Sequence, residues 1–392
     1  MSNQTKRKAS AIFSSWMGIG ATWFGVHLGP GTASGRQGAT YYGQYGGWSF
    51  FMPFIAMAIL GVVVYITIEY MRRNQLNRYR DFFDHFFSPN QKVFSYLFDF
   101  LYFVTYFMIT GAALFTGGQI LADQSGLPYI LCVALIVVIS LLLIIFGQHI
   151  VRVANSFMTW IMLGVILLIV IFAFGSPQNE FSANLQNPEL AFNMSKLFPA
   201  LWSAFVYACF QASGVVGSTA SVTEGLADRK ESKKAAVFGW GANAVLLALI
   251  GLMQFGFQAQ QSASMPNYEI LKILNQPLLF WAYVILVELA VISSIIGMNN
   301  GVATRVDKYV KITNPVVRNL ILNVAFLAGA VLVSLVGLTA IVNVGFRYLG
   351  YAAIPIIILP ILIIGVKKVF ANKQELPDTA AKAHLAATTK KK

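Results

Sequence analysis

The sequence has little charge and few metal-binding side chains. Only 11% of its 392 residues are charged, whereas soluble domains carry about a quarter. Its two cysteines, Cys132 and Cys209, lie in apolar runs, and its four histidines are scattered. This composition excludes a disulfide framework and a zinc cluster. No HExxH, GxSxG or convincing nucleophile–base pair occurs, so we expect neither an enzyme nor an organic cofactor.

Apolar runs of about 20 residues, long enough to cross a bilayer as a helix, recur along the whole chain. They predict an all-α polytopic membrane protein, embedded in lipid, with ten transmembrane helices. The first and sixth spans contain small, helix-breaking residues. The expected spans are about 11–45 (broken), 48–71, 93–122, 129–147, 152–175, 198–224 (broken), 234–258, 277–303, 316–336 and 338–366.

The net charge of +13 points to membrane orientation and not to nucleic-acid binding. Of the 28 lysines and arginines, 24 fall on one side of the predicted membrane. The opposite side has only Lys196 and Lys272, and Arg36 and Arg347 lie within spans. By the positive-inside rule both termini are cytoplasmic in a multi-pass protein of the cell membrane. An even number of spans requires the same arrangement.

The spans repeat at an offset of about 185 residues, which pairs span two with seven and span five with ten. Because each half has an odd number of spans, the second half enters from the opposite side, giving a five-plus-five inverted repeat. Coincidence among evenly spaced helices is the alternative. The expected segments are a cytoplasmic N-terminus 1–10, a first repeat 11–175, an extracellular loop 176–197, a second repeat 198–366 and a basic cytoplasmic tail 367–392.

The first span contains "GVHLGPGTASGRQ" at 25–37, where glycines and Pro30 interrupt any helix. The matching sixth span reads "FVYACFQASGVVGSTASVTEG" at 205–225. Unwound backbone is tolerated at membrane depth only where it lines protein or a wet cavity. Paired interruptions in the two halves therefore predict the binding site of a transporter.

This topology resembles the amino acid–polyamine–organocation superfamily with the LeuT-like fold. Within it, "GPGTASGRQ" followed by "YYGQYG" looks like the signature of YkvI-like bacterial membrane proteins. The topological likeness covers nearly the whole chain, whereas the motif is short. The resemblance implies a secondary transporter, since members of the superfamily mostly move amino acids or related amines with sodium or protons. It does not imply a particular substrate.

The resemblance also implies a sodium site. Span eight reads "ELAVISSIIGMNNG", in which Ala290, Ser293 and Ser294 have the family's spacing. Matching the glycine pair places the first-span carbonyls at Gly25 and Leu28. These five oxygens suit Na⁺. The alternative is that the serine hydroxyls bond to local carbonyls or pack between helices. On the same span, Ser293, Gly297 and Asn300 share a face that leads from the site toward the cytoplasm.

Substrate is expected at the two interruptions. Pro30 has no N–H group, so the N–H groups of Gly31 and Thr32 are the candidates for holding a carboxylate. The pocket wall would come from span three, at Tyr106 and Thr110, which equally could only pack. The other candidate substrate-binding residues are Gly29, Phe210, Gln211, Ser213 and Gly214.

Four ionisable residues are candidates for gating or coupling. His27 lies beside the break and is either a proton carrier or a structural residue. Arg36 matches the approximate place of the outer-gate arginine of LeuT-like transporters, but span ten offers Arg347 where those have an acid. Glu288 or a substrate carboxylate must therefore offset one arginine. Asp99 is expected to pair with a loop base.

The sequence favours a secondary active transporter of an amino acid or related carboxylate-bearing solute, coupled to Na⁺. Alternatives are a proton-coupled transporter of an amine or other organic cation, and a non-transporting receptor with the same fold. A channel would not need two broken half-helices. The substrate, the stoichiometry and the oligomeric state are left open.

Overall fold

The computed structural model describes residues 15–76, 79–146, 148–220, 222–223, 225–306, 310–312 and 314–371. The predicted N-terminus 1–10 and the tail beyond 371 lie outside these residues, as does the side chain of Asn300. All regular structure in the described residues is helical. Seven helices there are long and apolar enough to span a membrane, and Tyr129–Ile145 and Ile161–Phe174 are shorter apolar helices.

Eight uninterrupted helices begin and end within about five residues of the expected limits. Long apolar runs form them because a helix satisfies every backbone N–H and C=O group within its own segment. Their bounds are α5 Met52–Arg73, α7 Gln91–Ser125, α8 Tyr129–Phe146, α9 Gln148–Phe174, α11 Leu197–Ala220, α12 Arg229–Phe255, α14 Pro277–Val306 and α15 Pro315–Ser334.

The first span is broken, as predicted. It consists of α2 Ser15–His27, α3 Pro30–Ala33 and α4 Arg36–Tyr41. Pro30 cannot donate to the carbonyl of Val26, so the helix stops before it. Gly35 then turns the chain with φ of +82°, a conformation that residues with a Cβ rarely adopt. A 3₁₀ segment, η1 Gly43–Phe50, leads into α5.

The predicted interruption of the sixth span is wrong. Residues 198–220 of that span form one continuous helix, α11, which ends at Ala220. The segment has no proline after Pro199, and its hydroxyls bond to carbonyls of the preceding turn: Ser213 to Phe210, at 2.7 Å, and Ser218 to Gly214, at 2.8 Å. Small residues and hydroxyls thus stay helical here, because nothing removes a backbone donor.

The last span has irregularities that we did not predict. It alternates α-helical and wider π-helical turns, and all of them follow one another without a gap. Pro355 and Pro360 each remove one backbone donor, and π turns are a common response to such defects. The segments are α16 Leu338–Ala340, η5 Ile341–Phe346, α17 Arg347–Ala353, η6 Ile354–Ile358, α18 Leu359–Gly365 and η7 Val366–Ala371.

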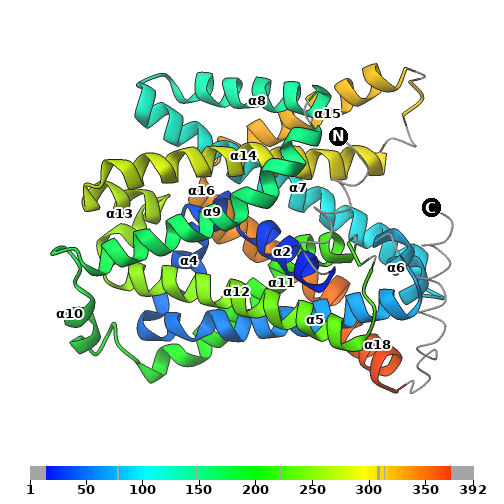
Figure 1. Ribbon diagram of the computed structural model, residues 1–392, viewed down its shortest axis with the longest axis horizontal. Coiled ribbons are helices and arrows are strands. Elements are labelled where there is room, and N and C mark those ends of the chain that lie inside the picture. The colour runs from blue at the N-terminus through cyan, green and yellow to red at the C-terminus, as the bar shows by residue number, and fades with distance from the viewer. Residues whose placement is uncertain are drawn as a thin grey trace.

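The helices form two groups (Figure 1). In one, α2, α5, α11 and α12 pack together; in the other, α7 packs with α8, α14 and α15, and α14 also contacts α9. The last span joins them, because α17 packs on both α11 and α7. The first span thus begins inside one group, and its next segment, α3, contacts α7 and α14 of the other.

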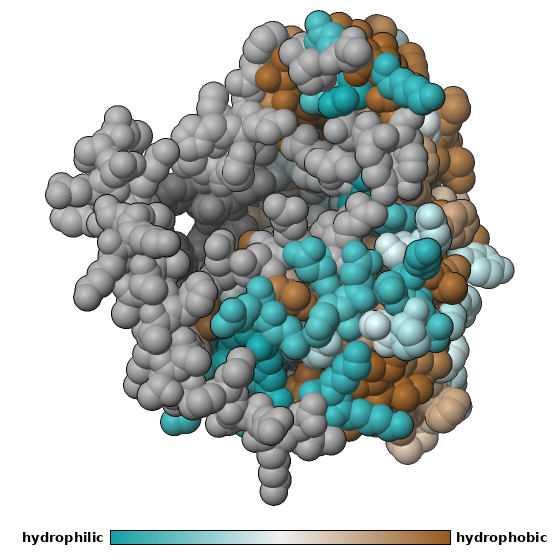
Figure 2. Space-filling model, turned by 90° about the vertical axis from the view of Figure 1, so that its right-hand side faces the viewer, coloured by the Kyte–Doolittle hydropathy of each residue, from teal (hydrophilic) through white to brown (hydrophobic). Residues whose placement is uncertain are grey.

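The two ends of the molecule differ in charge. One, which we call the basic end, has α6 Tyr79–Phe86 and the described cations Arg72, Arg73, Arg229, Arg305 and Lys368. Figure 2 looks onto this end and shows hydrophilic side chains spread over its described part. The opposite end, which we call the loop end, has α10 Phe181–Gln186, η2 Met194–Lys196, η3 Gln258–Ser262 and α13 Pro266–Leu274.

Two acidic residues at the basic end are paired. The carboxylate of Glu69 contacts Arg72 at 2.9 Å and Arg73 at 2.8 Å, all on α5. Asp99 lies 3.3 Å from Arg305, which confirms that it pairs with a basic residue following span eight. This second pair joins α7 to the end of α14.

Candidate functional site

The break between α2 and α3 leaves several backbone groups free. Among the described residues, nothing donates to the carbonyls of Gly25 and Leu28, and the N–H of Gly31 has no acceptor. The N–H groups of Thr32 and Ala33, by contrast, both bond to the carbonyl of Gly29 at 3.0 Å. Of the two N–H groups expected to hold a carboxylate, only that of Gly31 is therefore available.

Buried polar side chains surround the break. We call the six of them the central polar cluster: His27, Thr32, Gln37, Tyr207, Gln211 and Asn243. All are at most 7% exposed. They come from α2, α3, α4, α11 and α12, so the cluster ties both parts of the broken span to the continuous helices beside it. Such buried networks persist only when their donors and acceptors are satisfied.

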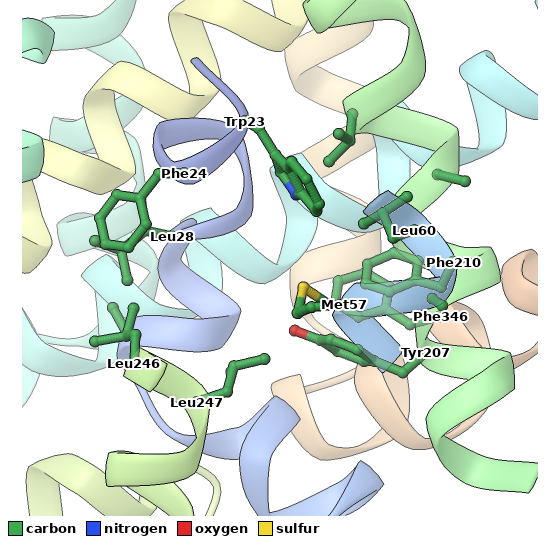
Figure 3. Close-up of a cluster of buried hydrophobic side chains, with 14 of the residues drawn as sticks. Trp23, Phe24, Leu28, Met57, Leu60, Tyr207, Phe210, Leu246, Leu247 and Phe346 are labelled. Carbon is green, nitrogen blue, oxygen red and sulfur yellow. The ribbon is translucent and has the colours of Figure 1, made fainter. Parts of the chain in front are cut away.

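His27 is held at both ring nitrogens. Its Nδ1 lies 2.6 Å from Oδ1 of Asn243, and its Nε2 lies 2.8 Å from the hydroxyl of Tyr207. The amide nitrogen of Asn243 donates to the carbonyl of Gly239, at 2.7 Å, which fixes the orientation of that amide. Tyr207 stands beside Phe210 and Phe346, with its hydroxyl directed toward the first span (Figure 3).

The side-chain oxygen of Gln37 accepts the remaining hydrogen bonds of the cluster. Its Oε1 lies 2.9 Å from the hydroxyl of Thr32, 3.0 Å from that of Tyr207 and 3.2 Å from Nε2 of Gln211. The Thr32 hydroxyl is also 2.8 Å from the carbonyl of His27. A methyl group at Gly31 would collide with the Gln37 amide, so glycine makes room for it. Gln211 thus faces the pocket region, as its cost in lipid suggests.

On the loop-end side, Arg36 is only 7% exposed and makes no ion pair with a described residue. Its guanidinium donates to the carbonyls of Gln261 at 3.0 Å and Ala263 at 2.9 Å, and to the hydroxyl of Thr40. Thr40 in turn bonds to Asn343 on η5, at 2.6 Å. Arg36 therefore fastens the first span to the loop at η3 and to the last span.

Further bonds close the same side. Nε2 of Gln254 on α12 donates to the carbonyl of Gly35, at 2.9 Å. The side chain of Asn267 donates to the carbonyl of Ala33 at 3.0 Å, and its backbone N–H to that of Ser34. Tyr283 on α14 also donates to Ala33, at 2.9 Å. With Arg36, these contacts leave α3 and α4 covered from the loop end.

Arg347 and Glu288 are not brought together. Arg347 is partly exposed on α17, close enough to act on the Tyr41 hydroxyl, and it bonds to no described residue. Glu288 points instead between α7 and α8, where a methyl group at Gly117 would lie 2.9 Å from its Oε2. Its Oε1 is buried and has no partner in the described chain. No contact joins Glu288 to Arg36 or Arg347 in the described residues, as would be needed if its carboxylate offset the charge of either arginine.

The residues expected in the pocket wall differ in whether their polar groups are free to bind a ligand. Tyr106 is fully buried, and its hydroxyl donates to Asn299, whose amide donates to Asn323. Thr110 is fully buried, and its hydroxyl has no hydrogen-bond partner in the described part of the chain. Phe210 stacks on Phe346, and Ser213 bonds within α11. Gly214 is partly exposed and faces the side chain of Val26. Tyr106 and Ser213 are thus occupied by contacts within the protein.

The serine hydroxyls of the expected ion site are free. Ser293 and Ser294 are partly exposed and neither makes a hydrogen bond to another described residue; Ala290 is buried one turn earlier. A serine hydroxyl within a helix usually bonds to a carbonyl of the preceding turn. Among the described residues, no contact joins these hydroxyls to Gly25 or Leu28, which belong to the first span.

Several small residues on α2, α11 and α14 are exposed or partly exposed. Gly18, Thr22 and Gly25 share one partly exposed face of α2, and Val26 beside them is 39% exposed. On α11, Gly214 and Ser218 are also partly exposed. Gly297 on α14 is exposed, with nothing within 4 Å of an added methyl group. Because Val26 and Gly214 face each other, this surface lies between helices.

Four functional candidates were not singled out from the sequence: Gln37, Tyr207, Asn243 and Asn343. Each is a polar residue in an apolar span, and such residues usually face the interior of a helix bundle. That signal was present. The spacing of these residues in the sequence does not show which side chains they contact, because the partners lie 170 or more residues away.

No known protein-family model and no curated protein matches this chain. Solved structures do. MhsT in complex with L-phenylalanine superposes with a TM-score of 0.64 at 14% identity, covering 93% of this chain and 94% of that one. The inward-facing conformation of Mhp1 gives 0.60 at 13% identity, with 89% and 77% covered. The manganese transporter of Eremococcus coleocola gives 0.58 at 12% identity, with 89% and 78% covered.

These identities are low, so the likeness concerns the fold. It covers about nine-tenths of the chain and supports the predicted fold class. The protein is an all-helical, multi-pass membrane protein with the LeuT fold.

Proposed function

We propose that this protein is a secondary active transporter of an amino acid or related solute bearing a carboxylate, coupled to Na⁺. We place it in the YkvI-like branch of the superfamily on its "GPGTASGRQ" motif. The observation that carries the proposal is the break between α2 and α3, with free backbone groups beside a buried polar cluster. Interrupted helices at membrane depth are tolerated where they line protein or a water-filled cavity, and in transporters they form the binding site.

The charges around the break favour an anionic group on the substrate. The free N–H of Gly31 points to an acceptor, and Arg347 is a cation without a partner in the described residues. The hydroxyl of Tyr41, on which the charge of Arg347 acts, is buried and also lacks a partner in the described residues. No acidic side chain bonds to the central polar cluster within the described chain. A carboxylate would satisfy these donors, whereas a carboxylate-free amine would meet a cation.

A transition metal is a less suitable cargo. The described residues contain no group of three His, Cys, Asp or Glu side chains that could hold such an ion. Neutral oxygens are the ligands that suit Na⁺ here. The free carbonyls of Gly25 and Leu28 and the free hydroxyls of Ser293 and Ser294 fit that requirement, with the Ala290 carbonyl as a fifth ligand.

The two ends of the site indicate the state of the transporter. Arg36 and its neighbours close the loop end, while Gly18, Gly25 and Gly297 are partly or fully exposed. Under the positive-inside rule the basic end is cytoplasmic. We infer that the site is closed on the side of the loop end, and that alternating access brings the proposed Na⁺ ligands of the first span and α14 together.

Uptake into proteoliposomes tests the function. Protein reconstituted in liposomes is given single radiolabelled amino acids, and polyamines as a comparison, under a Na⁺ gradient, a proton gradient or neither. We expect accumulation of a carboxylate-bearing solute that requires the Na⁺ gradient and falls in Arg347→Ala. Saturable binding without accumulation would instead identify a receptor. Accumulation of a polyamine, unchanged in Arg347→Ala, would contradict the proposal.

A further inference from the structure

The first turns of α12, at the basic end, present three lysines on one side of the helix. Lys230, Lys233 and Lys234 are all exposed. The next exposed residues along α12 are Val237, at 60%, and Val245, at 48%. At 3.6 residues per turn, these five side chains fall within a sector of about 120°. We call this sector, with its three lysines and two valines, the lysine face.

Charged and apolar side chains are separated along the lysine face. The lysines occupy the first turns of α12, and Val237 and Val245 lie about 10 and 22 Å beyond the first of them. On the opposite side of the helix, Ser232, Gly239 and Asn243 are buried in the protein. Because α12 is long and apolar enough to span a membrane, the lysine face meets lipid. Its cations lie at the depth of headgroups and its valines at the depth of acyl chains.

The three lysines form no ion pair with an acidic side chain in the part of the chain that the structure describes. The two acids of the same stretch bond to backbone N–H groups. Asp228 accepts from the N–H of Glu231 at 2.8 Å, and Glu231 accepts from that of Ala227, also at 2.8 Å. The charge of the lysine face is therefore left for a partner outside the described protein.

An aromatic side chain from α2 lies beside the lysine face. Nζ of Lys234 is 5.9 Å from the centre of the Trp16 ring. The same ring meets Phe238 edge to face, with centroids 6.0 Å apart. Trp16 is partly exposed, and tryptophan is typical of the membrane–water interface, where its ring lies at headgroup level. Trp16 thus gives an independent indication that the lysines lie at that level.

We propose that the lysine face, together with Trp16, binds an anionic phospholipid such as phosphatidylglycerol in the leaflet at the basic end. The headgroup phosphate accepts hydrogen bonds from the ammonium groups, and an acyl chain lies along the two valines. A zwitterionic headgroup brings its own cation, which the lysines repel. A soluble anion leaves the apolar half of the face without an occupant. Each lysine near an anionic membrane surface strengthens binding about fivefold.

The bound lipid has a structural role through α2. That helix begins at Ser15, beside the lysine face, and ends at His27, where the first span breaks. It packs on α12 along its length (Figure 1). A headgroup in contact with both Trp16 and Lys234 holds the start of α2 against α12. The lipid therefore stabilises the packing of the segment that leads to the break. This inference does not depend on the proposed transport function.

Brominated lipids, which quench nearby tryptophans, test the contact. The chain has seven tryptophans, so the fluorescence of Trp16 is obtained as the difference between the protein and its Trp16→Phe form. The full-length protein is placed in phosphatidylcholine nanodiscs with rising fractions of dibrominated phosphatidylglycerol or dibrominated phosphatidylcholine. We expect phosphatidylglycerol to quench Trp16 at a much lower fraction. Equal quenching by the two lipids would overturn the proposal.

A pair of substitutions tests the lysines. Lys230→Gln with Lys233→Gln removes two charges and leaves Lys234 on Trp16, so the preference for phosphatidylglycerol at Trp16 should fall about 25-fold. The matched control is Lys92→Gln with Lys311→Gln, which removes two exposed lysines from the same predicted side of the membrane. It should keep the preference. Equal losses in both pairs would indicate diffuse attraction to the charged end and would contradict a site.

Thermal unfolding gives a second readout. A lipid that binds the folded state raises the melting midpoint, so phosphatidylglycerol should raise it above the value in phosphatidylcholine for the wild type and the control pair only. Equal midpoints of all three proteins in phosphatidylcholine show that the variants fold. A full rise in the Lys230→Gln, Lys233→Gln protein would overturn the proposal. Soluble glycerol phosphate should leave every midpoint unchanged; a rise in the wild type would identify a site for a soluble anion instead.

Discussion

The ring of Phe210 on α11 lies against that of Phe346 on η5, with centroids 4.3 Å apart and planes within 14°. Both side chains are buried beside Tyr207 (Figure 3). This stack is one of the aromatic contacts between the last span and the group of α2, α5, α11 and α12. It lies next to the polar cluster, so its loss affects the packing behind Tyr207.

Phe346→Ala should therefore lower stability by about 3 kcal/mol, the usual cost of emptying a buried phenylalanine site. Thermal unfolding in detergent, followed by a thiol-reactive dye at buried Cys209, measures the change. Phe198→Ala is the control, since Phe198 is 79% exposed and its removal should have almost no effect. Equal midpoints for Phe346→Ala and the wild type would show that the stack contributes little.

Arg36→Ala should release the loop at η3 from the first span. It removes bonds from a charged donor to two carbonyls, and such bonds contribute about 1.5–3 kcal/mol each. Hydrogen–deuterium exchange of the backbone amides in 258–265 should rise. Lys272→Ala serves as the comparison, because Lys272 pairs with Asp123 and Glu269 near this loop and does not touch η3. Unchanged exchange in Arg36→Ala would show that Arg36 does not hold the loop at η3 to the first span.

Gly117→Ala should be destabilising by about 1–3 kcal/mol, the range for overpacking a close contact. The added methyl group meets Glu288 Oε2 at 2.9 Å, as well as Ile136 and Val291. A double-mutant cycle with Glu288→Ala isolates the first of these contacts. Gly117→Ala should cost less in the Glu288→Ala background. Strict additivity of the two substitutions would show that Glu288 does not occupy the space above Gly117.

Na⁺ should stabilise the protein, because an ion that binds only the folded state adds about 1.4 kcal/mol at a tenfold excess over its Kd. Melting curves in NaCl and in choline chloride at equal ionic strength measure this. Ser294→Ala should abolish the difference. Ser218→Ala should not, since the Ser218 hydroxyl already bonds to Gly214. A Na⁺ response that persists in Ser294→Ala would place the ion elsewhere.

Much of the fold could be predicted because its determinants are local in sequence. Long apolar runs fix the helices, and Pro30 fixes the break in the first span by removing a donor. The continuous α11 shows the limit of this reasoning: glycines and serines permit an interruption without requiring one. The π turns of the last span could not be predicted: η6 contains Pro355, but η5 lies before both prolines, and no residue type in it marks a wider turn.

The site was harder to predict, because its contacts join residues distant in sequence. His27 stood out as a histidine beside a break, but its partners Tyr207 and Asn243 lie on α11 and α12. Arg36 was expected to face an acid or a substrate, and it bonds to carbonyls of the loop at η3. Every residue has a backbone carbonyl, so no sequence pattern predicts which carbonyls will accept hydrogen bonds from Arg36.

The π turns of the last span have a consequence for how its relatives are compared. Each such turn accommodates one residue more than an α turn, and one residue rotates everything beyond it by about 100°. η5 lies immediately before Arg347, so the direction of Arg347 depends on that extra residue. Relatives that lack the bulge will need a single-residue gap between Leu338 and Arg347 to align correctly. Without that gap, an alignment would match Arg347 to a residue on a different face of the helix.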